Sequence, residues 1–192
     1  MGKFKQTLLT EEAYSQLKEA KELIEKSTGR KSSFTEAIRQ TVGKQLAMAK
    51  MDTDVKNYIK AFVDRIMDNK HTLGIILFGS VSKADYSRFS DIDLAIITDS
   101  SILNYMDYLN REIREIDSYQ DKIIQKGLSL YINPLIIRKD DMKNLNPIYF
   151  DIADDGIVLF ERKNEVTSFF ESLARIKHKK INTRGGEILV WG

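Results

Sequence analysis

The apolar positions of the chain change their spacing about a third of the way along it. Up to about residue 66 they recur every three or four residues, which predicts amphipathic helices. Beyond that point, short continuous apolar runs alternate with further helical stretches, a pattern typical of an α/β (α+β) domain with buried strands. The expected strands lie at residues 74–78, 92–97, 129–137, 156–160 and 187–191.

Helical patterns fill the intervals between these strands. A helix carrying Tyr58, Phe62 and Ile66 on one face precedes the first strand, and others are expected over residues 103–125 and 165–177. Another helix is expected between the third and fourth strands. Pro134 lies inside the third apolar run, and because proline has no N–H to donate, it predicts an edge strand or a bulge.

The first 50 residues have a different organisation. A short strand is predicted at residues 3–9, followed by a helix that Thr10 caps. The break STGRKSS separates it from a second helix that begins near Ser33 to Thr35. The sequence MDTD at 51–54 marks the junction, so the predicted domains are residues 1–50 and 51–192.

Composition narrows the class of protein only a little. The 192 residues are 42% hydrophobic and 30% charged, with a formal net charge of +2, which is ordinary for a globular protein. The absence of cysteine excludes disulfides and thiolate metal sites. No signal peptide or membrane-spanning run is present in the sequence, so we expect a soluble, cytoplasmic protein.

The stretch LFGSVSKADYSRFSDIDLAII at 77–97 carries the chemistry. Gly79 follows a buried strand and allows a phosphate to approach the backbone, while the Ser80 hydroxyl can donate to a phosphate oxygen. Ten residues later, Asp91 and Asp93 occupy alternate positions of a strand and therefore share a face. Two adjacent carboxylates repel each other unless a cation lies between them, and Mg²⁺ takes carboxylate and phosphate oxygens.

Gly-Ser, ten residues and Asp-x-Asp resemble the minimal nucleotidyltransferases of the DNA polymerase beta superfamily. The resemblance extends to Asp85 and covers roughly residues 55–192. It implies a nucleotidyltransferase fold with a mixed sheet flanked by helices, and transfer of a nucleoside monophosphate, often AMP, from a nucleoside triphosphate with release of pyrophosphate. The residues it implies are Gly79, Ser80, Lys83 and Ser90 for nucleotide binding, and Asp91 and Asp93 for catalysis and for Mg²⁺ or Mn²⁺.

One position departs from the family pattern. Members usually have a third carboxylate on a neighbouring strand, and the corresponding place in SLYINPLII is Asn133, with Tyr131 and Ser129 on the same face. Asp140 and Asp141 lie beyond this strand, and we expect them to cap the next helix. The triphosphate site does not depend on this departure, but the catalytic competence of the chain does.

Residues 1–50 resemble a ribbon-helix-helix unit, as found in antitoxins and small repressors. The matching segments are the strand, EEAYSQLKEAK and GRKSSFTEAIRQ. The resemblance implies a homodimer whose paired strands enter the DNA major groove. The expected DNA contacts are Lys3, Lys5, Gln6, Ser33 and Thr35. The alternative is a helical dimerisation arm that binds no DNA.

Two functions from different classes follow. One is a metal-dependent nucleotidyltransferase with an unidentified acceptor. The other is a DNA-binding, antitoxin-like regulator with a toxin protein as partner, whose nucleotide site is a sensor or a remnant; Asn133 favours it. Two remaining features have simpler interpretations: His71 is predicted to be a solvated turn residue, and KHKK at 177–180 is predicted to be the solvated end of a helix.

Overall fold

The computed structural model describes residues 46–176, scattered positions at 11, 14–15, 17–19, 21–22, 42 and 44, and the backbone alone of residues 178–183 and 186–191. The described positions between 11 and 22 and between 42 and 50 are helical. The predicted strand at 3–9 lies outside the described residues, as do Lys3, Lys5, Gln6, Ser33 and Thr35. The ribbon-helix-helix unit therefore stays a prediction.

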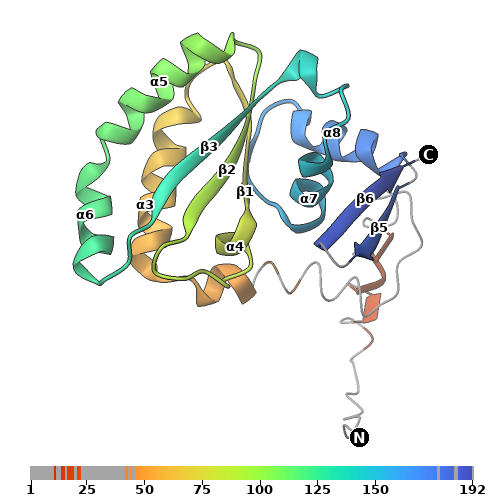
Figure 1. The fold of residues 1–192 in the computed structure, drawn as a ribbon, viewed down its shortest axis with the longest axis horizontal. Helices are drawn as coiled ribbons and strands as arrows, with labels where there is room; N and C mark the ends of the chain where they lie inside the picture. The colour runs from red at the N-terminus through yellow and green to blue at the C-terminus, as the bar shows by residue number, and fades with distance from the viewer. Residues whose placement is uncertain are drawn as a thin grey trace, which may run out of the picture.

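A four-stranded mixed sheet forms the centre of the molecule (Figure 1). Its strands are β1 (Thr72–Phe78), β2 (Asp91–Thr98), β3 (Tyr131–Arg138) and β4 (Ile157–Glu161), in the order β3-β2-β1-β4. Strand β1 runs antiparallel to β2 and β4, whereas β2 and β3 are parallel. These are the four central strands that the apolar runs predict, and Pro134 lies on an edge strand as expected.

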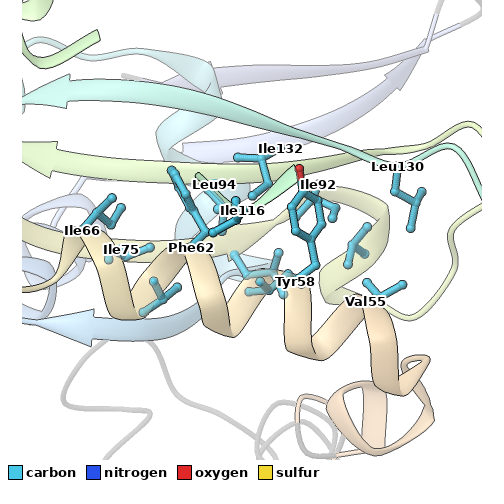
Figure 2. Close-up of a cluster of buried hydrophobic side chains, with 14 of the residues drawn as sticks. Val55, Tyr58, Phe62, Ile66, Ile75, Ile92, Leu94, Ile116, Leu130 and Ile132 are labelled. Atoms are coloured by element: carbon cyan, nitrogen blue, oxygen red, sulfur yellow. The ribbon is translucent and has the colours of Figure 1, made fainter. Parts of the chain in front are cut away.

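Helices cover both faces of this sheet (Figure 1). On one face lie α3 (Thr53–Ile66), α5 (Ile102–Arg114) and α6 (Asp117–Gln125); on the other lie α7 (Pro147–Asp155) and α8 (Glu165–Ala174). Figure 2 shows the first of the two resulting cores, in which Tyr58 and Phe62 of α3 pack against Ile92 and Leu94 of β2. The model therefore has the α/β fold, a mixed sheet flanked by helices, that the sequence predicts.

The alternation of side chains along β2 assigns the acidic pair to one face of the sheet. Ile92 and Leu94 enter the core under α3, α5 and α6, while Ala95 and Ile97 enter the core under α7 and α8. Because side chains i and i+2 of a strand share a face, Asp91 and Asp93 lie on the α7 and α8 face, at the end of the sheet that α4 (Gly79–Ser82) occupies.

The prediction of one continuous helix over residues 103–125 is wrong. Helix α5 ends at Arg114 and α6 begins at Asp117. Between them, Ile116 leaves the helical conformation and its side chain is buried in the same core as Tyr58. Ile123 of α6 is buried in this core as well.

Two further local predictions are wrong. Asp140 and Asp141 do not cap the next helix: they lie in the 3-10 turn η1 (Lys139–Asp141), and the side chain of Asn146 caps α7 instead. Residues 178–180 are not the end of a helix, since α8 ends at Ala174 and a strand begins at His178. Strands β5 (His178–Thr183) and β6 (Gly186–Trp191) form a separate antiparallel pair.

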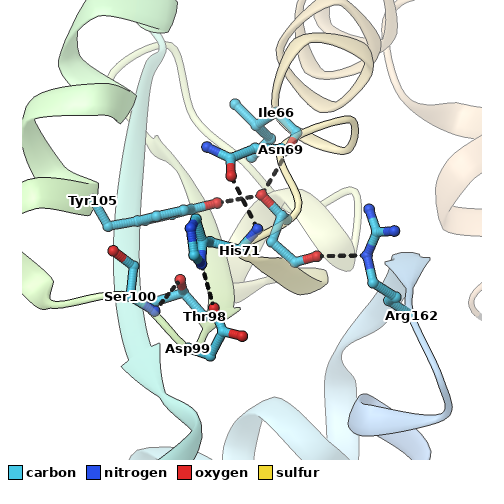
Figure 3. A network of polar contacts seen from close by, with 9 residues as sticks. Ile66, Asn69, His71, Thr98, Asp99, Ser100, Tyr105 and Arg162 are labelled. Atoms are coloured by element: carbon cyan, nitrogen blue, oxygen red, sulfur yellow. Dashed lines mark hydrogen bonds and ion pairs between the residues drawn. The ribbon is translucent and has the colours of Figure 1, made fainter.

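A network of hydrogen bonds and an ion pair lies at the end of the sheet opposite to α4 (Figure 3). The hydroxyl of the buried Thr72 donates a hydrogen bond to the carbonyl of Ile66. The Tyr105 hydroxyl forms a hydrogen bond with the same Thr72 hydroxyl. Nearby, His71 lies in a partly exposed turn, as predicted, and its Nδ1 is 2.7 Å from Asp99. None of the helices in the described part of the chain combines the length and apolar character needed to cross a bilayer.

Replacing Thr72 by valine should destabilise the fold. The change keeps the shape but leaves the buried Tyr105 hydroxyl and the Ile66 carbonyl without this partner, which costs about 1–3 kcal/mol of unfolding free energy. We expect a melting temperature roughly 3–8 °C lower by calorimetry. The control is Thr72→Ser, which keeps the hydroxyl and removes the methyl group; a Thr72→Val variant as stable as the wild type would contradict the hydrogen-bond argument.

Candidate nucleotide-binding and catalytic site

The site is built where β1 ends. Phe78, the last residue of β1, pairs with Asp93 of β2, and α4 begins at the next residue. Gly79 has a φ of +75°, a left-handed conformation that side chains disfavour. A Cβ atom at Gly79 would also lie 2.4 Å from Oδ2 of Asp93, so the carboxylate would have to shift to make room for it. Glycine therefore suits the backbone conformation here and leaves the Asp93 carboxylate in place.

This contact brings the two halves of the motif together. The backbone that the sequence assigns to phosphate binding lies directly against a carboxylate that it assigns to metal binding. Ser80 follows in the first turn of α4, where backbone N–H groups have no partner within the helix. A phosphate seated on the Gly79–Ser80 turn would therefore lie within reach of a cation held by Asp93.

Asn133 lies beside this carboxylate, at the position that the family pattern indicates. In the parallel β2–β3 pair, Asp91 is level with Tyr131 and Asp93 is level with Asn133. The Asn133 side-chain amide donates a hydrogen bond of 2.9 Å to Oδ1 of Asp93. The structure thus brings Gly79, Asp93 and Asn133 into contact, with Asp91 on the same face.

The electrostatics of the pair follow from this arrangement. Burial raises the pKa of Asp93, and the neighbouring Asp91 charge raises it further, while the hydrogen bond from Asn133 acts in the opposite direction. The folded protein therefore holds a partly buried carboxylate beside a second negative charge. A bound cation would remove this repulsion.

The remaining predicted nucleotide contacts have protein partners in this structure. The Lys83 ammonium lies 2.7 Å from a carboxylate oxygen of Asp155, the last residue of α7. The Ser90 hydroxyl accepts a hydrogen bond from the backbone N–H of Ser87 and so shapes the loop before β2. The Ser80 carbonyl accepts from the backbone N–H groups of Lys83 and Asp85, which fixes the turn after α4.

The sequence interpretation did not identify Asp155 as part of this arrangement. A signal was present: two acids, Asp154 and Asp155, close a predicted helix, where the helix dipole disfavours negative charge. Acids at that end require cations nearby, and Lys83 is one. The Nζ of Lys44, from the segment before the domain, donates to the carbonyl of Gly156 at the same helix end over 2.7 Å.

The side chains of this site provide some of the ligands that a divalent cation needs. Among the described residues, no group of three acidic or histidine side chains is arranged to hold a metal. Asp91 and Asp93 supply carboxylates, the ligands that Mg²⁺ prefers alongside substrate phosphates. Asn133 would supply an amide oxygen after rotating its side chain, since its nitrogen faces Asp93.

A family model decides the classification of this arrangement. The model described as polymerase beta, nucleotidyltransferase matches residues 60–165, more than half of the chain. The chain belongs to this nucleotidyltransferase family. The match begins within α3 and ends at the start of α8, so it includes Gly79, Asp91, Asp93 and Asn133. No curated protein matches the chain.

Neutralising Asp93 should stabilise the protein in the absence of metal. Because the folded-state pKa of Asp93 is raised above the ordinary value of 3.8, the folded state binds the proton more tightly than the unfolded state does. The ionised side chain therefore lowers the stability progressively as the pH rises from about 4 through the folded-state pKa. The variant Asp93→Asn removes this charge and keeps an oxygen that can accept from Asn133.

We expect the melting temperature of Asp93→Asn, measured in chelator at pH 7, to exceed that of the wild type by roughly 1–3 °C. The difference should vanish near pH 3, where both side chains are neutral. The matched control is Asp107→Asn on the exposed face of α5. A less stable Asp93→Asn variant would contradict the repulsion argument.

Proposed function

We propose that the chain is a metal-dependent nucleotidyltransferase that transfers a nucleoside monophosphate, with AMP as the leading case, from a nucleoside triphosphate to an acceptor hydroxyl. The observation that carries the proposal is the contact between Gly79 and the Asp93 carboxylate, which joins a phosphate cradle to a metal ligand. Membership of the polymerase beta nucleotidyltransferase family supports the reaction class.

Different residues of the site would bind the phosphates and the metal ion. The Gly79–Ser80 turn binds phosphate oxygens, and Lys83 contributes a positive charge once it leaves Asp155. When bound, Mg²⁺ or Mn²⁺ on Asp91 and Asp93 would neutralise the carboxylates and the triphosphate and stabilise the leaving pyrophosphate.

In the reaction, the acceptor oxygen forms a bond to the α-phosphorus as the bond to the bridging oxygen of pyrophosphate breaks. The acceptor hydroxyl must also lose its proton. An amide cannot accept a proton, so Asn133 does not provide the general base that a carboxylate at this place would provide. General-base assistance is typically worth on the order of a hundredfold or more in rate. We therefore propose that triphosphate binding is normal and transfer is slow.

A second proposal rests on the amide side chain at position 133. With an amide in place of the third carboxylate, the site can bind a nucleotide as a sensor or remnant in an antitoxin-like regulator. In this proposal the chain forms a homodimer, binds DNA through residues 1–50 and has a toxin protein as partner. It expects triphosphate binding without any transfer, whereas the first proposal expects slow transfer.

Triphosphate binding should require the cation. Without it, Asp91 and Asp93 repel each other and the phosphates, so ATP should bind measurably by calorimetry in Mg²⁺ and at least tenfold more weakly in chelator, a difference of about 1.4 kcal/mol or more. Asp93→Asn should lose most of the dependence on Mg²⁺. Equal ATP affinity with and without the cation would contradict the paired-carboxylate site.

Transfer should accelerate when Asn133 is changed to aspartate. Single-turnover rates with labelled ATP, saturating Mg²⁺ and the acceptor present in cell extract should rise on the order of a hundredfold. In chelator, the same variant should melt at a lower temperature than the wild type, because it adds a third negative charge, and Mg²⁺ should reverse the loss. Asn104→Asp on exposed α5 is the charge-matched control.

The two readouts of Asn133→Asp answer different questions. A rate that is already high in the wild type and unchanged in the variant would show that position 133 does not supply the third group. No transfer in either form, together with normal ATP binding, would favour the sensor proposal.

A further inference from the structure

The loop between α4 and β2 is tied to the domain at several points. The Tyr86 hydroxyl accepts a hydrogen bond of 3.0 Å from the backbone N–H of Asp52 at the start of α3. The carbonyl of Arg88 accepts one of 2.6 Å from the N–H of Ser129, just before β3. The conformation of the loop is therefore fixed from both sides before it enters β2 at Asp91.

This fixed loop presents a large apolar ring to solvent. Phe89 is 71% exposed, although it precedes Asp91 by only two residues. Two residues of extended chain span at most about 7 Å, so the Phe89 backbone lies next to the acidic pair. An exposed aromatic ring on an ordered loop beside such a site offers a surface on which a planar group can stack.

A cation already occupies one side of the ring. The guanidinium carbon of Arg88 lies 4.7 Å from the centre of the Phe89 ring, which is within the range of a cation–π contact. This contact orients the ring, and the large exposed fraction shows that the protein leaves much of the remaining ring surface open. A flat ligand therefore has exposed ring surface available to it at Phe89.

A second exposed aromatic residue borders Asp91 from the neighbouring strand. Tyr131 is 52% exposed and is level with Asp91 in the β2–β3 pair, on the same face as Asn133. Aromatic residues thus flank Asp91 both along the chain and across the sheet. A ligand that joins phosphates to a planar aromatic group matches this combination of carboxylates, arginine and exposed rings.

We infer that Phe89, with Arg88 stacked on its ring, is a platform for a nucleobase presented to the Asp91–Asp93 site. The inference rests on the proposed function, because it is the triphosphate site that gives the platform its role. Base stacking on an exposed aromatic side chain tolerates any base, since every base has a π face, and arginine adds a cation–π contribution. The base belongs either to the nucleoside triphosphate or to a nucleic acid that carries the acceptor hydroxyl.

The test compares ligands with and without a base on the full chain. Wild type and Phe89→Ala are titrated by calorimetry, in Mg²⁺, with ATP, with inorganic tripolyphosphate and with a short single-stranded adenosine oligonucleotide. Phe89→Ala should weaken binding of at least one base-containing ligand by about 5- to 100-fold, the usual effect of losing one base–aromatic stack. Tripolyphosphate binding should not change.

Three further variants make the comparison specific. Phe89→Tyr should retain the affinity, because the ring remains, and Arg88→Ala should give a smaller loss in the same ligand. Leu103→Ala is the matched control: this side chain is 80% exposed on α5, so its removal deletes a similar solvent-facing apolar group away from the loop. It should leave all three affinities unchanged.

The pattern of results separates the possible outcomes. A loss confined to ATP assigns the platform to the triphosphate, and a loss confined to the oligonucleotide assigns it to the acceptor. Unchanged affinity of Phe89→Ala for both base-containing ligands overturns the inference and leaves Phe89 as a contact for another protein. If wild type binds neither ATP nor tripolyphosphate, the proposed function fails, whereas a Phe89-dependent oligonucleotide affinity would still support the platform.

Discussion

The register between β1 and β2 is the constraint on which the site depends. Phe78 pairs with Asp93, so the chain turns at Gly79 directly against that carboxylate. Because strand side chains alternate, a slip of one residue would move Asp91 and Asp93 to the opposite face, where Ile92 and Leu94 pack under α3. The hydrophobic core therefore fixes the position of the acids: burying the isoleucine and leucine forces the aspartates onto the face where the Gly79–Ser80 turn lies.

Asn133 changes the electrostatic balance of this arrangement. An acid at that place would add a third negative charge level with Asp93, whereas the amide donates a hydrogen bond that stabilises the charged form of Asp93. An amide here favours folding of the ligand-free site, whereas the proposed transfer would gain from a proton acceptor at the same place. In the proposed reaction, stability and catalytic power would thus be opposed at a single position.

Most of the sheet could be predicted because its signals are local. Runs such as GIILF and IDLAII are too apolar to lie anywhere but in a core, and the two-residue period within DIDLAII places both acids on one face. The parallel pairing of β2 and β3 then sets Asn133 level with Asp93.

What could not be predicted depends on distant partners. The helical period continues through Ile116, where the chain leaves the helical conformation with this side chain buried in the core under α3. Lys179 and Lys180 suit a helix end by charge, and only pairing with β6 makes their segment a strand.

The ion pair between Lys83 and Asp155 shows how such a distant partner bears on function. Lys83 follows α4 and is the cation proposed for phosphate binding, but it contacts the acidic end of α7 in this structure. Both side chains are about half exposed, so the pair contributes at most about 1 kcal/mol, and a triphosphate carrying several charges can displace Asp155 readily. Burial lowers the pKa of Lys44, and the nearby charges of Asp155 and Asp154 act in the opposite direction, so a second cation lies close to this helix end. The end of α7 therefore lies between Lys83 and the segment that precedes the domain, and a shift of Lys83 toward a nucleotide would leave Lys44 as a cation near Asp155.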